Sequence, residues 1–70
     1  MGWRAAVYDQ VSSGEMASEN LQSYESLCRW IRERAEEDPS VTIHVVAPHD
    51  ATSDQLMELR RAGVRVSFAT

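Results

Sequence analysis

Hydrophobic and polar side chains alternate along three short stretches of the chain, which is the pattern of β-strands with one buried face. The stretches are residues 3–8 (WRAAVY), 41–47 (VTIHVVA) and 64–69 (VRVSFA). The second is rich in β-branched residues, and Val41, Ile43 and Val45 fall on one of its faces. We therefore expect three strands, each with one apolar face and one mixed face.

Two segments between these stretches have the three- and four-residue spacing of amphipathic helices. The apolar stripe of the first segment consists of Leu21, Tyr24, Leu27, Cys28, Ile31 and Ala35. We expect Ser18 or a neighbour to cap this helix, and Pro39 to end it. The second segment begins with TSDQ, in which Thr52 and Gln55 have the spacing of a capping box. Gly63 follows it and suits the left-handed conformation that ends a helix.

The order β-α-β-α-β predicts an α/β fold with parallel strands joined by crossovers. Doubly wound sheets bury both faces, so their strands are apolar throughout. Here the three strands share a mixed face instead, made of Arg4, Tyr8, Thr42, His44, Arg65 and Ser67. We therefore predict one domain over residues 1–70 with two layers: a three-stranded parallel sheet in sequence order, and both helices mainly on one face.

The mixed face is a candidate interface because Ala6, Tyr8 and Val46 make it amphipathic. Isolated apolar residues on a surface are also common, so exposure without a partner is the alternative interpretation. Trp30 lies slightly off the helical stripe, which is compatible with a helix edge or an interface. The predicted interface residues are Tyr8, Trp30, His44, Val46 and Arg65.

The small size of the chain favours a partner surface. A domain of 70 residues has a marginal core, because apolar burial and conformational entropy nearly cancel. The single cysteine, Cys28, cannot form an intramolecular disulfide, and one cysteine with two histidines does not have the spacing of a metal site. We expect no cofactor or metal, and we expect the partner to be a second copy of the chain or a larger protein.

The charge pattern narrows the classes of function. The chain has 11 acidic and 7 basic residues, and its formal net charge is −4. All the basic residues are arginines, so Schiff-base catalysis and a P-loop cation are excluded. The acidic balance argues against nucleic-acid binding, which needs a basic patch. The chain has neither a membrane-length apolar run nor a signal-peptide pattern, and its unpaired cysteine fits the cytoplasm.

The stretch around the end of the first predicted strand resembles the start of the serine recombinases, the family of resolvases and invertases. That family has a tyrosine at the strand end, an arginine two positions later, and then a nucleophilic serine followed by a second hydroxyl residue. The corresponding residues here are Tyr8, Asp9, Gln10, Val11, Ser12 and Ser13. The stretch SLCRWI resembles the interior of the long amphipathic helix that follows this motif in the family, and TSDQLMELRRAGVRVSF resembles a later helix that ends in a glycine turn and a strand.

The resemblance implies a reduced βαβαβ fold, half of a flavodoxin-like domain, with Ser12 as a nucleophile that attacks a DNA phosphodiester. In the family, several arginines stabilise the charge that develops on the phosphate. Here Gln10 replaces the nearest of them, and no arginine follows the second strand before Arg60. The resemblance therefore favours a non-catalytic relative over an active recombinase.

A third hypothesis comes from the carboxyl ends of the predicted parallel strands, where ligands bind in open α/β sheets. Ser12, His49 and Asp50 would meet there as a nucleophile, a base and an orienting acid of a small hydrolase. The same residues are also ordinary loop and turn residues. We favour a non-catalytic interaction module, with a DNA-cleaving or phosphoryl-transfer enzyme that uses Ser12 and a small hydrolase as the alternatives.

Overall fold

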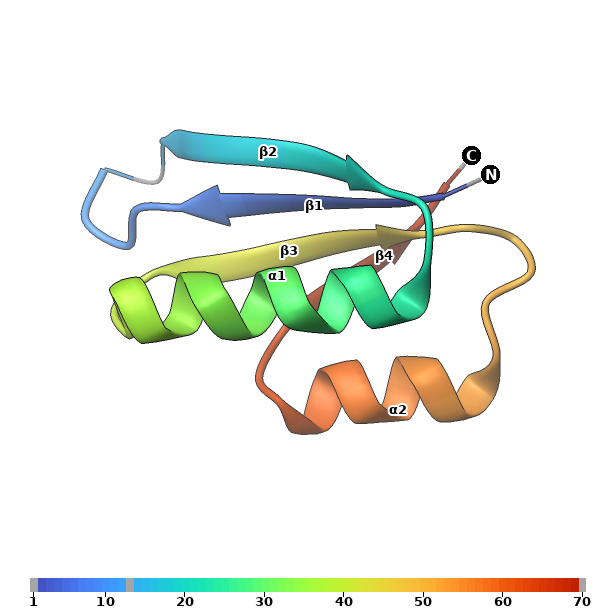
Figure 1. Cartoon of the computed structure of the whole chain (residues 1–70). Helices are drawn as coiled ribbons and strands as arrows, with labels where there is room; N and C mark the ends of the chain where they lie inside the picture. The colour runs from blue at the N-terminus through green and yellow to red at the C-terminus, as the bar shows by residue number, and fades with distance from the viewer. Residues whose placement is uncertain (1, 13, 70) are drawn as a thin grey trace.

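Two layers make up the fold in the computed structural model, which describes residues 2–12 and 14–69. One layer is a four-stranded mixed sheet, and the other consists of two helices that lie on the same side of it (Figure 1). In chain order the elements are β1 (Trp3–Tyr8), β2 (Glu15–Leu21), α1 (Tyr24–Glu37), β3 (Thr42–Ala47), α2 (Ser53–Arg61) and β4 (Arg65–Phe68). The α/β class and the placement of both helices on one face agree with the sequence-based predictions.

The sheet differs from the prediction in the number and direction of its strands. Its order is β2-β1-β3-β4, with β1 antiparallel to both neighbours and β3 parallel to β4. The predicted three-stranded parallel sheet and βαβαβ order are therefore incorrect. The unexpected strand, β2, forms a hairpin with β1 and reverses the chain once more before α1. That reversal makes β3 antiparallel to β1, although the two strands are neighbours as expected.

Backbone and side-chain hydrogen bonds close the loop between β1 and β2. The backbone N–H of Asp9 donates to the carbonyl of Gly14 at 3.0 Å, and Asp9 Oδ1 accepts from the N–H of Val11 at 2.8 Å. The N–H of Gly14 donates to Ser12 Oγ at 3.3 Å. An irregularity in the pairing follows at once, because Tyr8 pairs with Glu15 whereas Val7 pairs with Ala17.

The predicted cap of α1 is wrong, whereas the predicted start and end of α2 are confirmed. Ser23 caps α1 by accepting from the N–H of Ser26, so the cap is not Ser18, which lies within β2. The Thr52–Gln55 capping box of α2 is present with both of its hydrogen bonds. Gly63 follows α2 with a φ angle of 84°, the left-handed conformation that a residue without Cβ adopts at low cost.

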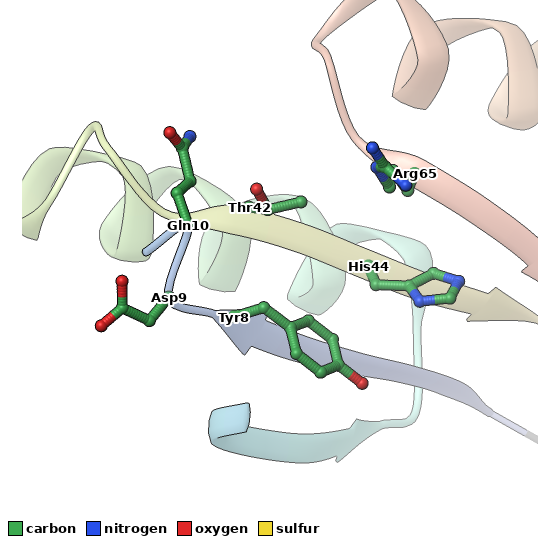
Figure 2. Close-up of a pocket in the computed structure, with 6 residues that line it drawn as sticks. All are labelled: Tyr8, Asp9, Gln10, Thr42, His44 and Arg65. Atoms are coloured by element: carbon green, nitrogen blue, oxygen red, sulfur yellow. The ribbon is translucent and has the colours of Figure 1, made fainter. Parts of the chain in front are cut away.

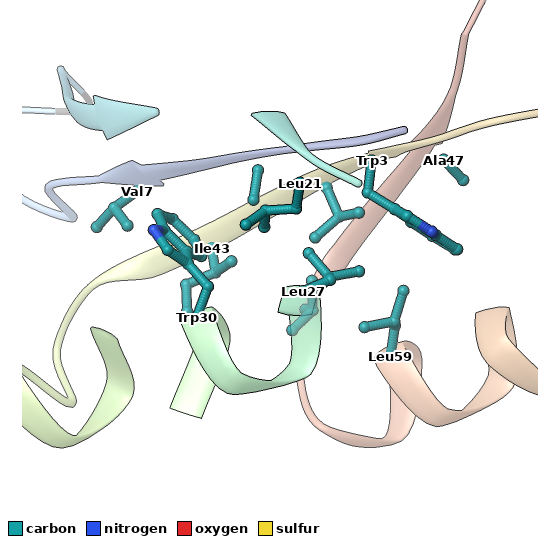
Figure 3. Close-up of a cluster of buried hydrophobic side chains, with 11 residues drawn as sticks. Trp3, Val7, Leu21, Leu27, Trp30, Ile43, Ala47 and Leu59 are labelled. Carbon is teal, nitrogen blue, oxygen red and sulfur yellow. The ribbon is translucent and has the colours of Figure 1, made fainter. Parts of the chain in front are cut away.

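The core lies between the sheet and the helices (Figure 3). The completely buried large side chains are Leu27 from α1 and Val45 from β3. Trp30, which we expected at a helix edge or an interface, is only 9% exposed and packs into this core. The remaining core residues are Trp3, Ala5, Val7, Leu21, Ile43, Ala47, Leu59 and Val64.

Candidate functional site

The face of the sheet opposite the helices is the candidate site, and we call it the open face. The strand registers place its residues as a grid of three rows across the sheet. The rows are Asn20–Arg4–Val46–Ser67, Ser18–Ala6–His44–Arg65 and Glu15–Tyr8–Thr42. None of the described helices lies on this side (Figure 1).

The centre of the open face is amphipathic, with Ala6, Tyr8 and Val46 beside His44. Ala6 on β1 is only 6% exposed, although no described helix covers it. The rings of Tyr8 and His44 are tilted at 45° to each other, with their centroids 6.3 Å apart. His44 Nε2 shares a hydrogen bond with Ser67 Oγ, which fixes the imidazole between β3 and β4.

Two shallow hollows run along the open face. One, of about 380 Å³, is lined by Tyr8, Asp9, Gln10, Thr42, His44 and Arg65, and Figure 2 shows these side chains spread over three strands and the β1–β2 loop. The other, of about 340 Å³, is lined by Arg4, Ala6, Tyr8, Glu15, His44 and Val46. Tyr8 and His44 line both, so the two hollows adjoin each other. Broad, open hollows of this kind suit a polypeptide segment better than a small molecule, which needs an enclosing pocket.

The charges on the open face are unequally distributed. Arg4 and Arg65 are exposed, and neither takes part in an ion pair with another described residue. The ion pairs in the described chain lie on α1, where Arg34 is 3.3 Å from Glu37 and 3.9 Å from Glu33. Among the described residues, the carboxylates that line the hollows of the open face are those of Asp9 and Glu15, at the end where β1 finishes. The face therefore carries two free guanidinium groups in a chain of net charge −4.

The structure does not bring together the residues of the predicted hydrolase site. Ser12 lies in the β1–β2 loop, whereas His49 and Asp50 follow β3. Because β1 and β3 are antiparallel, these loops lie at opposite ends of the sheet (Figure 1). The parallel sheet that would have gathered them at one rim is absent from the described residues. Both His49 and Asp50 are exposed.

The residues that resemble the recombinase motif are divided between the open face and the loop. Tyr8 and Gln10 line the first hollow, where Arg65 also contributes. Ser12 is exposed and does not line that hollow; its Oγ accepts the Gly14 N–H instead. Ser13 lies outside the described residues.

Residues 2–12 and 14–69 contain no group of three or more His, Cys, Asp or Glu side chains that could hold a metal ion. None of the helices described has the length and apolar character needed to cross a membrane. Cys28 is a half-buried free thiol on α1.

Alternation along three strands predicts most of the open face, including Arg4, Tyr8, Val46 and their neighbours. The contribution of β2 is not predicted. Glu15, Ser18 and Asn20 were missed because they lie on a strand with no apolar alternation. The usable signal was the loop itself: an Asp, two serines and a Gly in six residues is a composition typical of a hairpin turn.

Comparison of the chain with protein-family models, with curated proteins and with solved structures gives no match.

Proposed function

We propose that the chain is a non-catalytic protein-interaction module whose open face binds an acidic segment of a partner protein. The observation that carries this proposal is the packing of both helices on one face of the sheet, which leaves the opposite face, with its amphipathic centre, uncovered (Figure 1). A sheet with one solvated face is normally polar there. This one places Tyr8, Ala6 and Val46 at the centre of that face.

The charged side chains of the open face indicate the chemistry of the partner. Arg4 and Arg65 stand on either side of the apolar centre, and His44 lies between them in the grid. Arginine binds carboxylates with two parallel hydrogen bonds, so an Asp- or Glu-containing segment can pair with these free side chains. The rest of the chain carries an excess of acidic residues and would repel the same segment, so the charge distribution orients the partner toward the open face.

The alternatives that use Ser12 as a nucleophile have less support. A hydrolase needs a base within hydrogen-bond reach, and the predicted partners His49 and Asp50 lie at the other end of the sheet. A serine-recombinase-like ancestry stays a prediction that rests on the residues from Tyr8 to Ser12. We also propose a cytoplasmic location, because Cys28 is an unpaired thiol.

A binding experiment with designed peptides tests the proposal. One 12-residue peptide alternates Glu with Val and Tyr, and a second has Lys in place of every Glu. Isothermal titration calorimetry at 50 mM and 150 mM NaCl should show binding of the acidic peptide alone, weaker at the higher salt concentration. Arg4→Glu and Arg65→Glu should each weaken binding roughly tenfold, which corresponds to about 1.4 kcal/mol.

Arg32→Glu is the matched control, because Arg32 is exposed on α1 and its substitution makes the same change in net charge. It should leave peptide affinity within about twofold, because α1 lies on the opposite side of the sheet and salt screens exposed charges. Equal binding of the two peptides, or equal losses from Arg32→Glu and Arg65→Glu, would show that the open face is not the binding surface.

A further inference from the structure

The two edges of the sheet differ in how they are protected. The edge strand β4 has four residues and packs beside α2. The edge strand β2 has seven residues, and six of them are exposed. It contains neither lysine nor proline, two residues that protect many sheet edges from pairing, although it carries Glu15, Glu19 and the irregularity beside Tyr8.

The exposure of β2 extends to the side of the sheet where the helices lie. Ala17 and Glu19 pair with Val7 and Ala5, which belong to the core face, yet both are exposed. Helix α1 therefore reaches β2 mainly at its end, where Leu21 is buried. Along most of the strand, the backbone N–H and C=O groups on the outer side have no strand beside them in the described chain. Such an edge is a template for another strand.

We propose that a second copy of this chain pairs with β2, strand against strand and antiparallel, around a two-fold axis perpendicular to the sheet. The two four-stranded sheets then join into one sheet of eight strands. The two-fold symmetry makes the contact self-complementary and closed, so that the assembly stops at a dimer.

The glutamates of β2 favour one register for this pairing. A two-fold axis places one residue of β2 opposite itself, and side chains on the same face oppose each other. Centring on Glu19 would place that carboxylate opposite itself, and directly opposed like charges destabilise a sheet. Centring on Ala17 would draw the irregularity at Met16 into the pairing, because Glu15 lies on the open face and Glu19 on the face toward the helices. Centring on Ser18 avoids both, because Ser18 then faces itself and Ala17 faces Glu19.

The dimer also doubles the area of open face that is offered to a partner. Four strands spaced about 4.8 Å apart and five residues long give an open face of about 320 Å² in projection. A stable protein–protein interface buries about 800 Å² per partner. Rotation about an axis perpendicular to the sheet keeps both open faces on the same side. The dimer therefore presents about 650 Å² of continuous surface, which is nearer to that area than one open face, and a partner that bridges both halves gains avidity.

Cysteine cross-linking tests the pairing and its register. In a Cys28→Ser background, Ser18→Cys places two thiols directly opposite each other, with Cα atoms about 5 Å apart, which a disulfide can span. Asn20→Cys is the matched control on the same strand and face. Its two thiols would lie four residues out of register, about 14 Å apart. Under mild oxidation in non-reducing gels, Ser18→Cys should give mostly covalent dimer and Asn20→Cys mostly monomer.

A second measurement uses the mass of the cysteine-intact chain in solution. Sedimentation equilibrium at up to 1 mM in 150 mM NaCl should show a concentration-dependent dimer. Ser18→Lys should raise the dimer dissociation constant at least tenfold by protecting the edge. Met57→Lys adds the same charge on an exposed part of α2 and should leave it unchanged. Circular dichroism checks that both variants are folded.

Several outcomes would overturn the edge-pairing proposal. They are a monomer at 1 mM, equal cross-linking of the two cysteine variants, and a dimer that Ser18→Lys leaves intact. A monomer that still binds the acidic peptide would remove the dimer and leave the proposed function standing. A β2 dimer that binds neither peptide would do the reverse.

Discussion

The two faces of the sheet meet in adjacent residues of β3, where Val45 is completely buried under the helices and Val46 is half-buried on the open face. The covered face is filled by large apolar side chains from every strand except the outer part of β2. The open face has a small apolar centre surrounded by hydroxyl, amide and charged groups. Stability is therefore concentrated on one side of the sheet, and the other side is free to take part in binding.

The difference between the faces explains how so small a chain can supply a binding surface. Substitutions on the open face remove few packing contacts, so its chemistry can change without loss of the fold. Substitutions on the covered face act on a core that is marginal at 70 residues.

Truncation of the two adjacent valines should separate the faces most clearly. Val45→Ala leaves a cavity in the core and should lower the free energy of unfolding by about 2–3 kcal/mol. Val46→Ala should lower it by less than about 1 kcal/mol, as is usual at the surface. Urea unfolding followed by circular dichroism measures both values. Equal losses would mean that the open face is as much a core as the covered one.

Tyr24, which joins the two helices, and Tyr8, on the open face, differ in how much their hydroxyl groups contribute to stability. Tyr24 on α1 donates to the carbonyl of Gln55 at 3.4 Å and to Glu58 Oε1 at 3.3 Å, and so joins α1 to α2. Tyr24→Phe should cost about 0.5–1 kcal/mol of unfolding free energy. Tyr8→Phe on the open face should leave stability unchanged within about 0.5 kcal/mol. The same urea titration compares them, and a larger loss from Tyr8→Phe would contradict the assignment.

Tyr24 should also give the chain a dependence on alkaline pH. Burial raises the pKa of its phenol above the ordinary value of 10.0, and Cys28 and Glu58 add to the effect. The folded state therefore holds this proton more tightly than the unfolded state, so stability falls as the pH rises above about 10. In Tyr24→Phe this part of the fall should disappear. An unchanged pH profile between pH 9 and 11 would show that the phenol has no such role.

The smallest expected effect lies in the turn between α1 and β3, which belongs to neither face. Asp38 Oδ1 accepts from the hydroxyl of Ser40 at 2.6 Å and from its N–H at 3.0 Å, and these bonds lower the pKa of the carboxyl group below 3.8. This contribution to stability is present above pH 3.8 and is lost as the pH falls through the folded-state pKa. Ser40→Ala should raise that pKa, which an NMR titration of Asp38 would detect. An unaltered pKa would show that the hydroxyl bond contributes nothing.

The covered face could be predicted well from the sequence, because buried apolar residues recur with the regular spacing of strands and helices. The strands expected at 3–8, 41–47 and 64–69 are β1, β3 and β4 within one residue at each end. The capping box of α2 and the glycine that follows it are local signals that tertiary contacts did not override. The mixed residues of these strands do lie together on the face opposite the helices, as alternation indicated.

The sequence failed at β2 for a physical reason. The segment EMASENL is exposed at all but its last residue, so no apolar period marks it as a strand, and most of its residues have weak β-propensity. The strand is stabilised by pairing with β1, a contact that no local sequence pattern indicates. Missing this one strand reversed the direction of β3 relative to β1 and so placed Ser12 and His49 at the same end of the sheet.

Mapping of the acidic peptide by NMR tests the central claim most directly. The amide spectrum of the ¹⁵N-labelled chain would be recorded during titration with the alternating Glu peptide in 50 mM NaCl. We predict that the shifted amides belong to β1 and β3, and to Arg65 and Ser67 of β4, while the exposed residues of α1 and α2 stay unchanged. Shifts confined to the helices, with the open face unaffected at saturation, would contradict the account.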